Sequence, residues 1–107
     1  MVDEMDPEEL EERLTRGADV QVIDIRGPDS FAEGHIPGAT NVPLGRFARE
    51  IEDQEFGDEV VVACPLGESS LQAARLLESY EGVDEETRVA NLAGGYEAWD
   101  GDLEGEP

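Results

Sequence analysis

The chain has 107 residues, enough for one domain built around one hydrophobic core. Its single cysteine excludes an intramolecular disulfide and any CxxC metal or redox motif, and it indicates a reducing environment. Asp and Glu number 28 against seven Arg and no Lys, and the resulting formal net charge of -21 argues against nucleic acid as a partner.

Helical and β-branched segments alternate along the chain. The capping-box sequence Asp6-Pro7-Glu8-Glu9 predicts a short peripheral helix that ends at Gly17. Strands are predicted at 20–25, 59–63 and 88–92, with a short extended piece at 40–42. Helices are predicted at 44–54, from the loop after Cys64 to about residue 80, and at 96–99, with one helical turn at 29–33. Turns are predicted at 82–86 and 93–95, and residues 100–107 are expected to form a loose acidic tail.

This alternation predicts the fold class. Each crossover between strands is long enough to contain a helix, so we expect an α/β fold with an open, mainly parallel sheet of about four or five strands and helices on both faces. We expect a single domain over residues 1–107, with its core at about 5–99. Binding sites in such sheets lie beyond the carboxyl ends of the strands. Cys64, the pair Gly94 and Gly95, and the segment after Ile25 all lie at such ends.

Cys64 begins a loop, Cys64-Pro65-Leu66-Gly67-Glu68-Ser69-Ser70, that joins a strand to a helix. Such a loop points successive backbone N–H groups and the positive end of the helix at the thiol. This setting lowers the pKa of a cysteine from about 8.5 into roughly the 3.5–7.5 range, where the nucleophilic thiolate forms. From the local sequence alone, a small inert cysteine at the end of a buried strand is an equal alternative.

The helix after this loop has a polar and an apolar side when projected at about 100° per residue. The polar side contains Glu68, Gln72, Arg75 and Ser79, and the apolar side contains Ala73, Ala74, Leu76, Leu77 and Tyr80. We therefore expect Arg75 to face solvent, away from Cys64.

Several segments resemble the rhodanese-like sulfurtransferases. Their first signature is matched by Asp24-Ile25-Arg26, Phe31, Gly34-His35-Ile36-Pro37-Gly38-Ala39 and Asn41-Val42-Pro43. Gly94-Gly95-Tyr96-Glu97-Ala98-Trp99 is similar to the second signature, and Cys64 stands at the active-site position of the family. The resemblance, over about residues 5–99, implies a single-domain sulfurtransferase without a metal or cofactor. Cys64 would take a sulfane sulfur from thiosulfate or another small anionic donor as a persulfide and pass it to cyanide, a thiol or a protein acceptor.

The resemblance also assigns the other site residues. The backbone of the loop would form the donor cradle, with Leu66, Gly67, Glu68, Ser69 and Ser70 as its members. Many loops of the family read Cys-x-x-Gly-x-Arg, whereas this chain has Ser69 in place of the Arg and Glu68 beside it. We therefore expect weak binding of thiosulfate. Cysteine phosphatases and arsenate reductases of the same fold need an Arg at the end of the loop, which is absent here.

Three polar residues of the first signature are expected to support the loops rather than to act in acid–base chemistry. They are Asp24, Arg26 and His35. Tyr96 and Trp99 are expected to pack the last helix against the sheet. Two further functions stay open beside the enzyme: a non-catalytic protein-binding module, and a persulfide relay in a thiolation or cofactor pathway.

The acidic composition resembles that of proteins from extreme halophiles, which keep molar salt in their cytoplasm; an ordinary acidic protein is the alternative. At molar salt the Debye length falls to about 3 Å, which screens most self-repulsion. The 38% of apolar residues are grouped in periodic segments, which favours a folded domain over disorder. No apolar run is long enough to cross a bilayer, so we expect a soluble, cytoplasmic monomer.

Overall fold

The computed structural model describes residues 2–80 and 83–105. The strands are β1 (Asp3–Met5), β2 (Gln21–Asp24), β3 (Thr40–Asn41), β4 (Glu59–Ala63) and β5 (Arg88–Leu92). The α-helices are α1 (Pro7–Thr15), α2 (Pro28–Glu33), α3 (Phe47–Glu50) and α4 (Ser69–Glu78). Short 3-10 helices occur at η1 (Leu44–Arg46), η2 (Ile51–Asp53) and η3 (Gly95–Ala98).

The five strands form one parallel sheet in the order β1-β5-β4-β2-β3. This confirms the predicted open parallel sheet. β1 was not predicted from the sequence. It pairs with β5 in the register Asp3 with Ala90 and Met5 with Leu92. β1 has only three residues, and two of them are exposed and acidic, so it lacks the apolar alternation that marks a strand.

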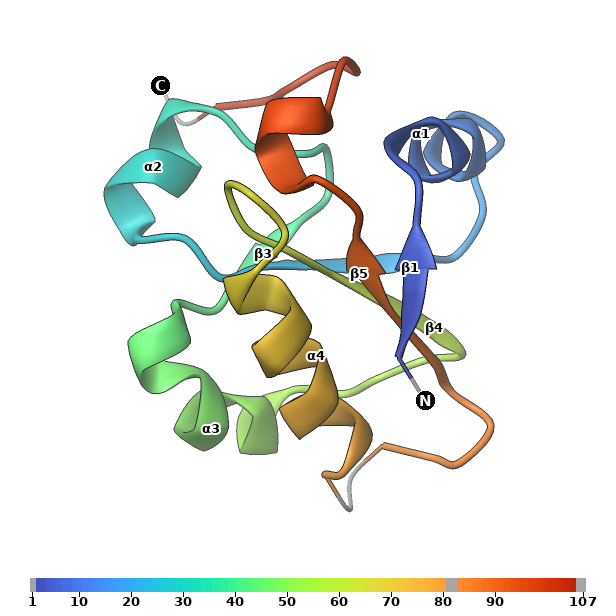
Figure 1. The fold of residues 1–107 in the computed structure, drawn as a ribbon, viewed down its shortest axis with the longest axis vertical. Helices are drawn as coiled ribbons and strands as arrows, with labels where there is room; N and C mark the ends of the chain where they lie inside the picture. Colours follow the sequence, from blue (N-terminus) through green and yellow to red (C-terminus); the bar gives the residue numbers. More distant parts are fainter. Residues whose placement is uncertain (1, 81–82, 106–107) are drawn as a thin grey trace.

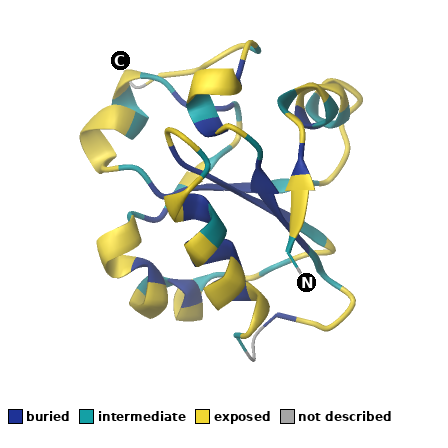
Figure 2. Cartoon of the chain, viewed as in Figure 1, coloured by how far each residue is buried: buried dark blue, intermediate teal, exposed yellow. Residues whose placement is uncertain are grey.

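Both faces of the sheet are covered. Alternate residues of a strand point to opposite faces, so Val60 and Val62 of β4 pack with the cluster that includes α3 and α4 residues, whereas Val61 and Ala63 pack with the α1 cluster. Figure 1 shows α1 and the 3-10 helix η3 on one side of the sheet and α3 and α4 on the other. Figure 2 shows the central strands as the buried layer between them. The prediction of helices on both faces is therefore confirmed.

The helix predicted at 44–54 is broken into η1, α3 and η2. Gly45 lies in its first turn, and Arg46 leaves the helical region at φ -118° and ψ 4°. Glycine is a poor helix former, so the first turn tightens into a 3-10 helix instead of continuing the α-helix. Of the apolar residues spaced for one buried helix face, Phe47 and Ile51 are buried, whereas Leu44 and Ala48 are exposed.

The expectation that Leu76 lies on the buried side of α4 is wrong, because this side chain is 44% exposed. α4 is buried along the narrow stripe of Ser70, Ala73, Ala74 and Leu77. Leu76 is turned roughly 110° from the centre of that stripe at 100° per residue. Arg75 is exposed, as the projection indicated.

The segment after η3 returns to the molecule. Glu104 and His35 form an antiparallel bridge through two backbone hydrogen bonds of 2.8 and 2.9 Å. The Glu104 carboxylate also accepts a hydrogen bond from the Gly38 amide at 2.7 Å. Glu104 is therefore tied to the loop around His35, and the expectation of a loose tail is wrong there. Residues 106 and 107 lie outside the described residues.

The turn predicted at 82–86 is described only from residue 83 onward, because residue 82 lies outside the described residues. The Thr87 amide donates to the Asp84 carbonyl at 3.0 Å there.

Within the described ranges, the structure has no helix that is both long enough and apolar enough to cross a membrane.

Candidate functional site

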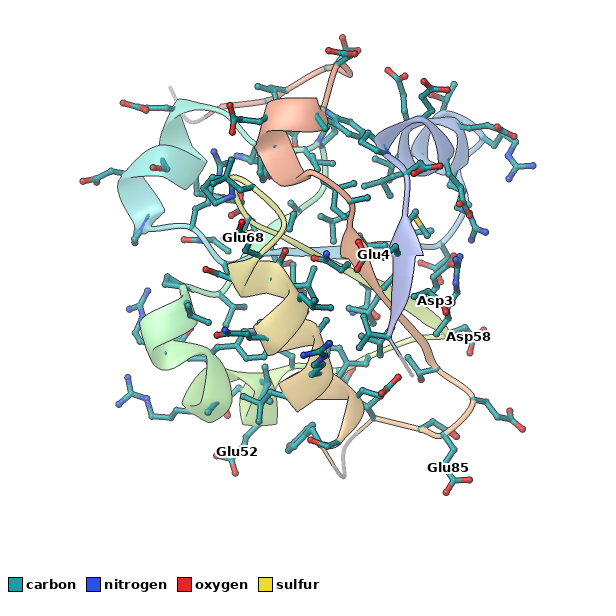
Figure 3. The ribbon with its side chains drawn as sticks, in the orientation of Figure 1. Asp3, Glu4, Glu52, Asp58, Glu68 and Glu85 are labelled. Atoms are coloured by element: carbon teal, nitrogen blue, oxygen red, sulfur yellow. The ribbon has the colours of Figure 1, made fainter. Side chains whose placement is uncertain are left out.

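Cys64 follows the last residue of β4 directly, at the carboxyl end of the sheet. Its side chain is only 2% exposed. The loop then turns back and α4 begins at Ser69. Figure 3 shows Glu68 on this loop, immediately before α4. The thiol is therefore held where a strand, a tight loop and the start of a helix meet.

Two backbone amides of the loop point at the sulfur. The Gly67 N–H donates to Cys64 Sγ at 3.0 Å, and the Ser70 N–H donates to it at 3.3 Å. Gly67 has a φ of +85°, which favours glycine. A Cβ at this position would also lie 3.0 Å from the backbone nitrogen of Gly94. Glycine is thus needed at residue 67 for both its conformation and its close packing.

The loop lowers the pKa of the Cys64 thiol. Burial raises this pKa, but hydrogen bonds from the Ser70 hydroxyl and from the amides of Ser70, Gly67 and Leu66 outweigh it. Hydrogen bonds to a charged group stabilise that form, so the thiolate is favoured over its state in a free cysteine. Three of the residues assigned to the cradle therefore act directly on the sulfur.

A glycine pair supports the loop from behind. The Tyr96 amide donates to the Cys64 carbonyl at 2.9 Å, and the Glu97 amide donates to the Pro65 carbonyl at 3.0 Å. Gly94 and Gly95 have φ values of 73° and 62° and make the turn that brings these amides into place. The second signature motif therefore contacts the cysteine loop directly.

Asn91 of β5 also contacts the loop and was not identified from the sequence. Its side-chain oxygen accepts the hydroxyl hydrogen bond of Ser70, and its Nδ2 group donates to the Gly67 carbonyl at 3.0 Å. It is 2% exposed. The available signal was a lone amide side chain near the carboxyl end of a buried strand, which by itself indicates only a buried polar residue.

Asp24 and Arg26 lie in a separate cluster that ties three loops together. Arg26 donates to both carboxylate oxygens of Asp24 at 2.8–3.1 Å and to the Gly34 carbonyl at 2.6 Å. The Tyr96 hydroxyl donates to Asp24 at 2.8 Å, and the Arg26 guanidinium stacks 3.7 Å above the Tyr96 ring centroid. Burial and the Asp24 carboxylate raise the pKa of Tyr96, so its hydroxyl stays protonated. These contacts join the end of β2 to the segments at Gly34 and Tyr96.

His35 is directed toward the α2 and C-terminal segments. Its Nδ1 is 2.8 Å from the Phe31 carbonyl oxygen, and the two rings stack with their centroids 3.8 Å apart. Its Nε2 lies 3.6 Å from the Glu104 carboxylate. Among the described residues no hydrogen bond joins His35 to Cys64, whose sulfur accepts from Gly67 and Ser70, so the structure does not pair the two side chains.

A shallow pocket of about 150 Å³ opens over the sulfur. It is lined by Cys64, Pro65, Leu66, Glu68 and Ser69. Leu66 is 55% exposed at its rim, and Glu68 is the charged residue of the lining. Nowhere in residues 2–80 and 83–105 do three His, Cys, Asp or Glu side chains gather closely enough to hold a metal ion. The pocket therefore lies beside a cysteine whose pKa is lowered.

Comparison with known proteins gives a consistent picture. The model of the family described as the rhodanese-like domain matches residues 6–102. A protein of Allochromatium vinosum named sulfurtransferase is 38% identical over 100 residues, which cover 92% of this chain and 89% of that protein.

Solved structures match over nearly the whole chain. A rhodanese-like domain protein from Staphylococcus aureus has a TM-score of 0.82 at 25% identity, covering 99% of this chain and 100% of that chain. A rhodanese-related protein from Thermoplasma volcanium has a TM-score of 0.81 at 20% identity, covering 95% and 97%, and shows likeness of fold alone.

Proposed function

Because this chain belongs to the rhodanese-like domain family, we propose that it is a sulfurtransferase that carries sulfur on Cys64. One observation supports this more than any other: two loop amides donate to Sγ at 3.0 and 3.3 Å. A buried cysteine that served only as a hydrophobic residue would need no such donors. Donors that stabilise a thiolate also suit the terminal sulfur of a persulfide, which carries the same negative charge.

The proposed reaction has two displacement steps. In the first, the Cys64 thiolate attacks the outer sulfane sulfur of the donor, a new S–S bond forms, and the donor's S–S bond breaks. The donor leaves with the bonding electron pair, as sulfite when the donor is thiosulfate. In the second step an acceptor thiolate or cyanide attacks the outer sulfur of the persulfide, and Cys64 leaves as a thiolate. The covalent intermediate divides one transfer into two easier steps.

We propose that the donor is a persulfide of low charge rather than free thiosulfate. The pocket lining contains Glu68 and exposed apolar surface of Leu66, and it contains no cation. A thiosulfate dianion would be repelled by the Glu68 carboxylate, whereas a protein or small-molecule persulfide would contact Leu66. The protein would then act as a relay that passes sulfur between two thiols.

The experiment that tests sulfur transfer is intact-mass measurement in molar KCl after incubation with thiosulfate and with cysteamine persulfide, whose ammonium group offsets the charge of its persulfide. We expect a gain of one sulfur atom with the persulfide, and a smaller yield with thiosulfate. The gain should vanish in Cys64→Ser and on treatment with cyanide or a thiol. Absence of any gain with both donors, or a gain that survives Cys64→Ser, would rule out the proposed function.

A second candidate is a non-catalytic module that uses the loop to bind a partner protein. The observation that favours it is the exposed Leu66 at the pocket rim in a loop without Arg. Negligible cyanolysis with every donor, combined with stable partner binding that Leu66→Ser abolishes, would favour this candidate.

We further propose that the protein is a cytoplasmic monomer, which sedimentation in molar KCl and cell fractionation would test.

A further inference from the structure

Asn91 lies under the cysteine loop and uses its whole side chain there. Its Nδ2 group donates to the Gly67 carbonyl at 3.0 Å and to the two Glu4 carboxylate oxygens at 3.1 Å each. Its Oδ1 accepts from the Ser70 hydroxyl. A primary amide has two N–H donors and one carbonyl oxygen, and all three are directed at a partner.

These partners fix which way the amide points. If it were flipped, Oδ1 would face the Gly67 carbonyl and the Glu4 carboxylate, which are acceptors only. Glu4, on β1, therefore selects the orientation in which Nδ2 faces Gly67. Figure 3 shows Glu4 beside β5, which is the strand that carries Asn91. The three-residue edge strand thus takes part in ordering the site.

The two loop residues that Asn91 holds are also the two whose amides donate to the sulfur. Gly67 is held through its carbonyl and donates through its N–H at 3.0 Å. Ser70 is held through its hydroxyl and donates through its N–H at 3.3 Å. We propose that Asn91 is a positioning residue of the sulfur-transfer site, which holds Gly67 and Ser70 so that their amides converge on Cys64 Sγ. That the converging amides serve sulfur transfer rests on the proposed function; the way in which Asn91 positions them does not.

Loss of Asn91 has two opposite physical effects. The Ser70 hydroxyl has one proton, for which Asn91 Oδ1 and the Cys64 thiolate compete; without Oδ1 this competition ends, which favours the thiolate. Loss of Asn91 also releases the Gly67 carbonyl and the Ser70 side chain, so that two amide donors lose their fixed direction. The thiolate would lose the fixed direction of two amide donors and gain at most one hydroxyl proton. We therefore expect the loss of the amide donors to dominate and the Cys64 thiol to become less acidic.

The experiment measures the rate of Cys64 alkylation by iodoacetamide against pH, in molar KCl, for Asn91→Leu and Asn91→Ala. Asn91→Leu keeps a branched side chain of similar length and removes all of its side-chain hydrogen bonds. Asn41→Ala is the matched control, because Asn41 also donates from a sheet end to two loop carbonyls, those of Asp24 and Arg26. We expect the midpoint to rise by about one pH unit in both Asn91 variants and to stay in place in Asn41→Ala.

Amide hydrogen exchange by NMR provides a second readout of position. Exchange at Gly67 and Ser70 should become at least about tenfold faster in Asn91→Leu, while exchange in β4 stays unchanged. An unchanged or lowered midpoint, or unchanged exchange at both amides, would overturn the positioning role. Both measurements are made on the free thiol, without a sulfur donor. A negative result in them can therefore be told apart from a failure of the wild-type protein to take up sulfur.

Discussion

The Tyr96 amide donates a hydrogen bond of 2.9 Å to the carbonyl oxygen of Cys64, so the turn after β5 is fastened to the residue that carries the thiol. Tyr96 also donates its hydroxyl to the buried Asp24 carboxylate at 2.8 Å. One residue therefore links the cysteine loop to the segment that follows β2. This link explains why two motifs far apart in the sequence, together with Cys64, define one site.

The turn itself should tolerate no side chain at residue 95. A Cβ on Gly95 would lie 2.2 Å from the Cys64 carbonyl oxygen and 2.7 Å from the Gly67 nitrogen. We expect Gly95→Ala to lower the free energy of unfolding by about 3 kcal/mol or more, since the clash is with backbone. Chemical denaturation in molar KCl measures this loss.

Gly17→Ala is the matched control for that substitution. Gly17 has a φ of +75°, but a Cβ there would meet nothing within 4 Å. Gly17→Ala should lower the free energy of unfolding only by the strain of a non-glycine residue in the left-handed region, about 1–2 kcal/mol. Equal losses for the two variants would show that the close packing of Gly95 against the cysteine loop does not matter.

Much of this architecture could be predicted because the relevant signals are local. The β-branched residues of β2 and β4 are buried on both faces of a parallel sheet, and such strands are mostly apolar. The position of Cys64 at the end of β4 follows from the same pattern. Topology then brings every carboxyl-end loop to one edge.

The features that were missed depend on contacts between distant residues. Asn91 and Ser70 are 21 positions apart, and their hydrogen bond exists only because β5 and β4 are neighbours. The bridge from Glu104 to His35 involves a segment whose acidic, glycine-containing composition is that of a free tail. Composition describes such a segment alone and carries no information about the surface it meets.

The thiol of Cys64 should be more acidic than a free cysteine. Its pKa is lowered by hydrogen bonds to the thiolate, with the Ser70 hydroxyl prominent among them. We expect alkylation by iodoacetamide to show a midpoint below about 8.5, the value for an unperturbed thiol. Ser70→Ala should raise this midpoint. Ser79→Ala, which removes the hydroxyl of the residue that follows α4 at its far end, should leave it in place.

The same pKa shift predicts a pH dependence of stability. A group whose pKa is lower in the folded state binds fewer protons in that state than in the unfolded state at pH values between the two pKa values. The stabilisation by the thiolate is therefore complete above the unfolded pKa, and it is lost as the pH falls through the folded pKa. Denaturation midpoints of wild type and Cys64→Ser should diverge as the pH rises toward about 8.5. Parallel curves over that window would contradict the shift.

Glu68 should reduce the use of thiosulfate. Its carboxylate belongs to the pocket lining, and like charges repel. We expect Glu68→Gln to increase kcat/KM for thiosulfate several-fold at low salt, with little change for a neutral persulfide. The gain should shrink toward molar KCl, because the exposed carboxylate is screened there.

Two other exposed glutamates are suitable controls for Glu68. Figure 3 shows Glu52 and Glu85 at the lower edge of the molecule, away from Glu68 and the cysteine loop. Glu52→Gln and Glu85→Gln change the net charge by the same amount as Glu68→Gln. An equal gain in all three variants would assign the effect to the net charge of -21 rather than to the pocket.

That net charge should make the fold dependent on salt. Arg88 forms ion pairs with Asp3 and Glu59, and Arg13 also pairs with Glu59, yet seven Arg cannot neutralise 28 acidic side chains. Salt weakens these few attractions, but it screens a larger number of repulsions between exposed carboxylates. We expect the Tm to rise by roughly 10 °C or more between about 0.1 M and several molar KCl.

A charge-reduced variant separates screening from other effects of salt. Glu52→Gln, Asp58→Asn and Glu85→Gln together remove three exposed charges that point away from the body of the protein in Figure 3. If repulsion is the cause, this variant should be more stable than wild type at 0.1 M KCl and equal to it at several molar. NaCl and KCl should act alike at equal ionic strength. A Tm that stays constant with salt, or a variant that gains equally at every concentration, would contradict repulsion as the cause.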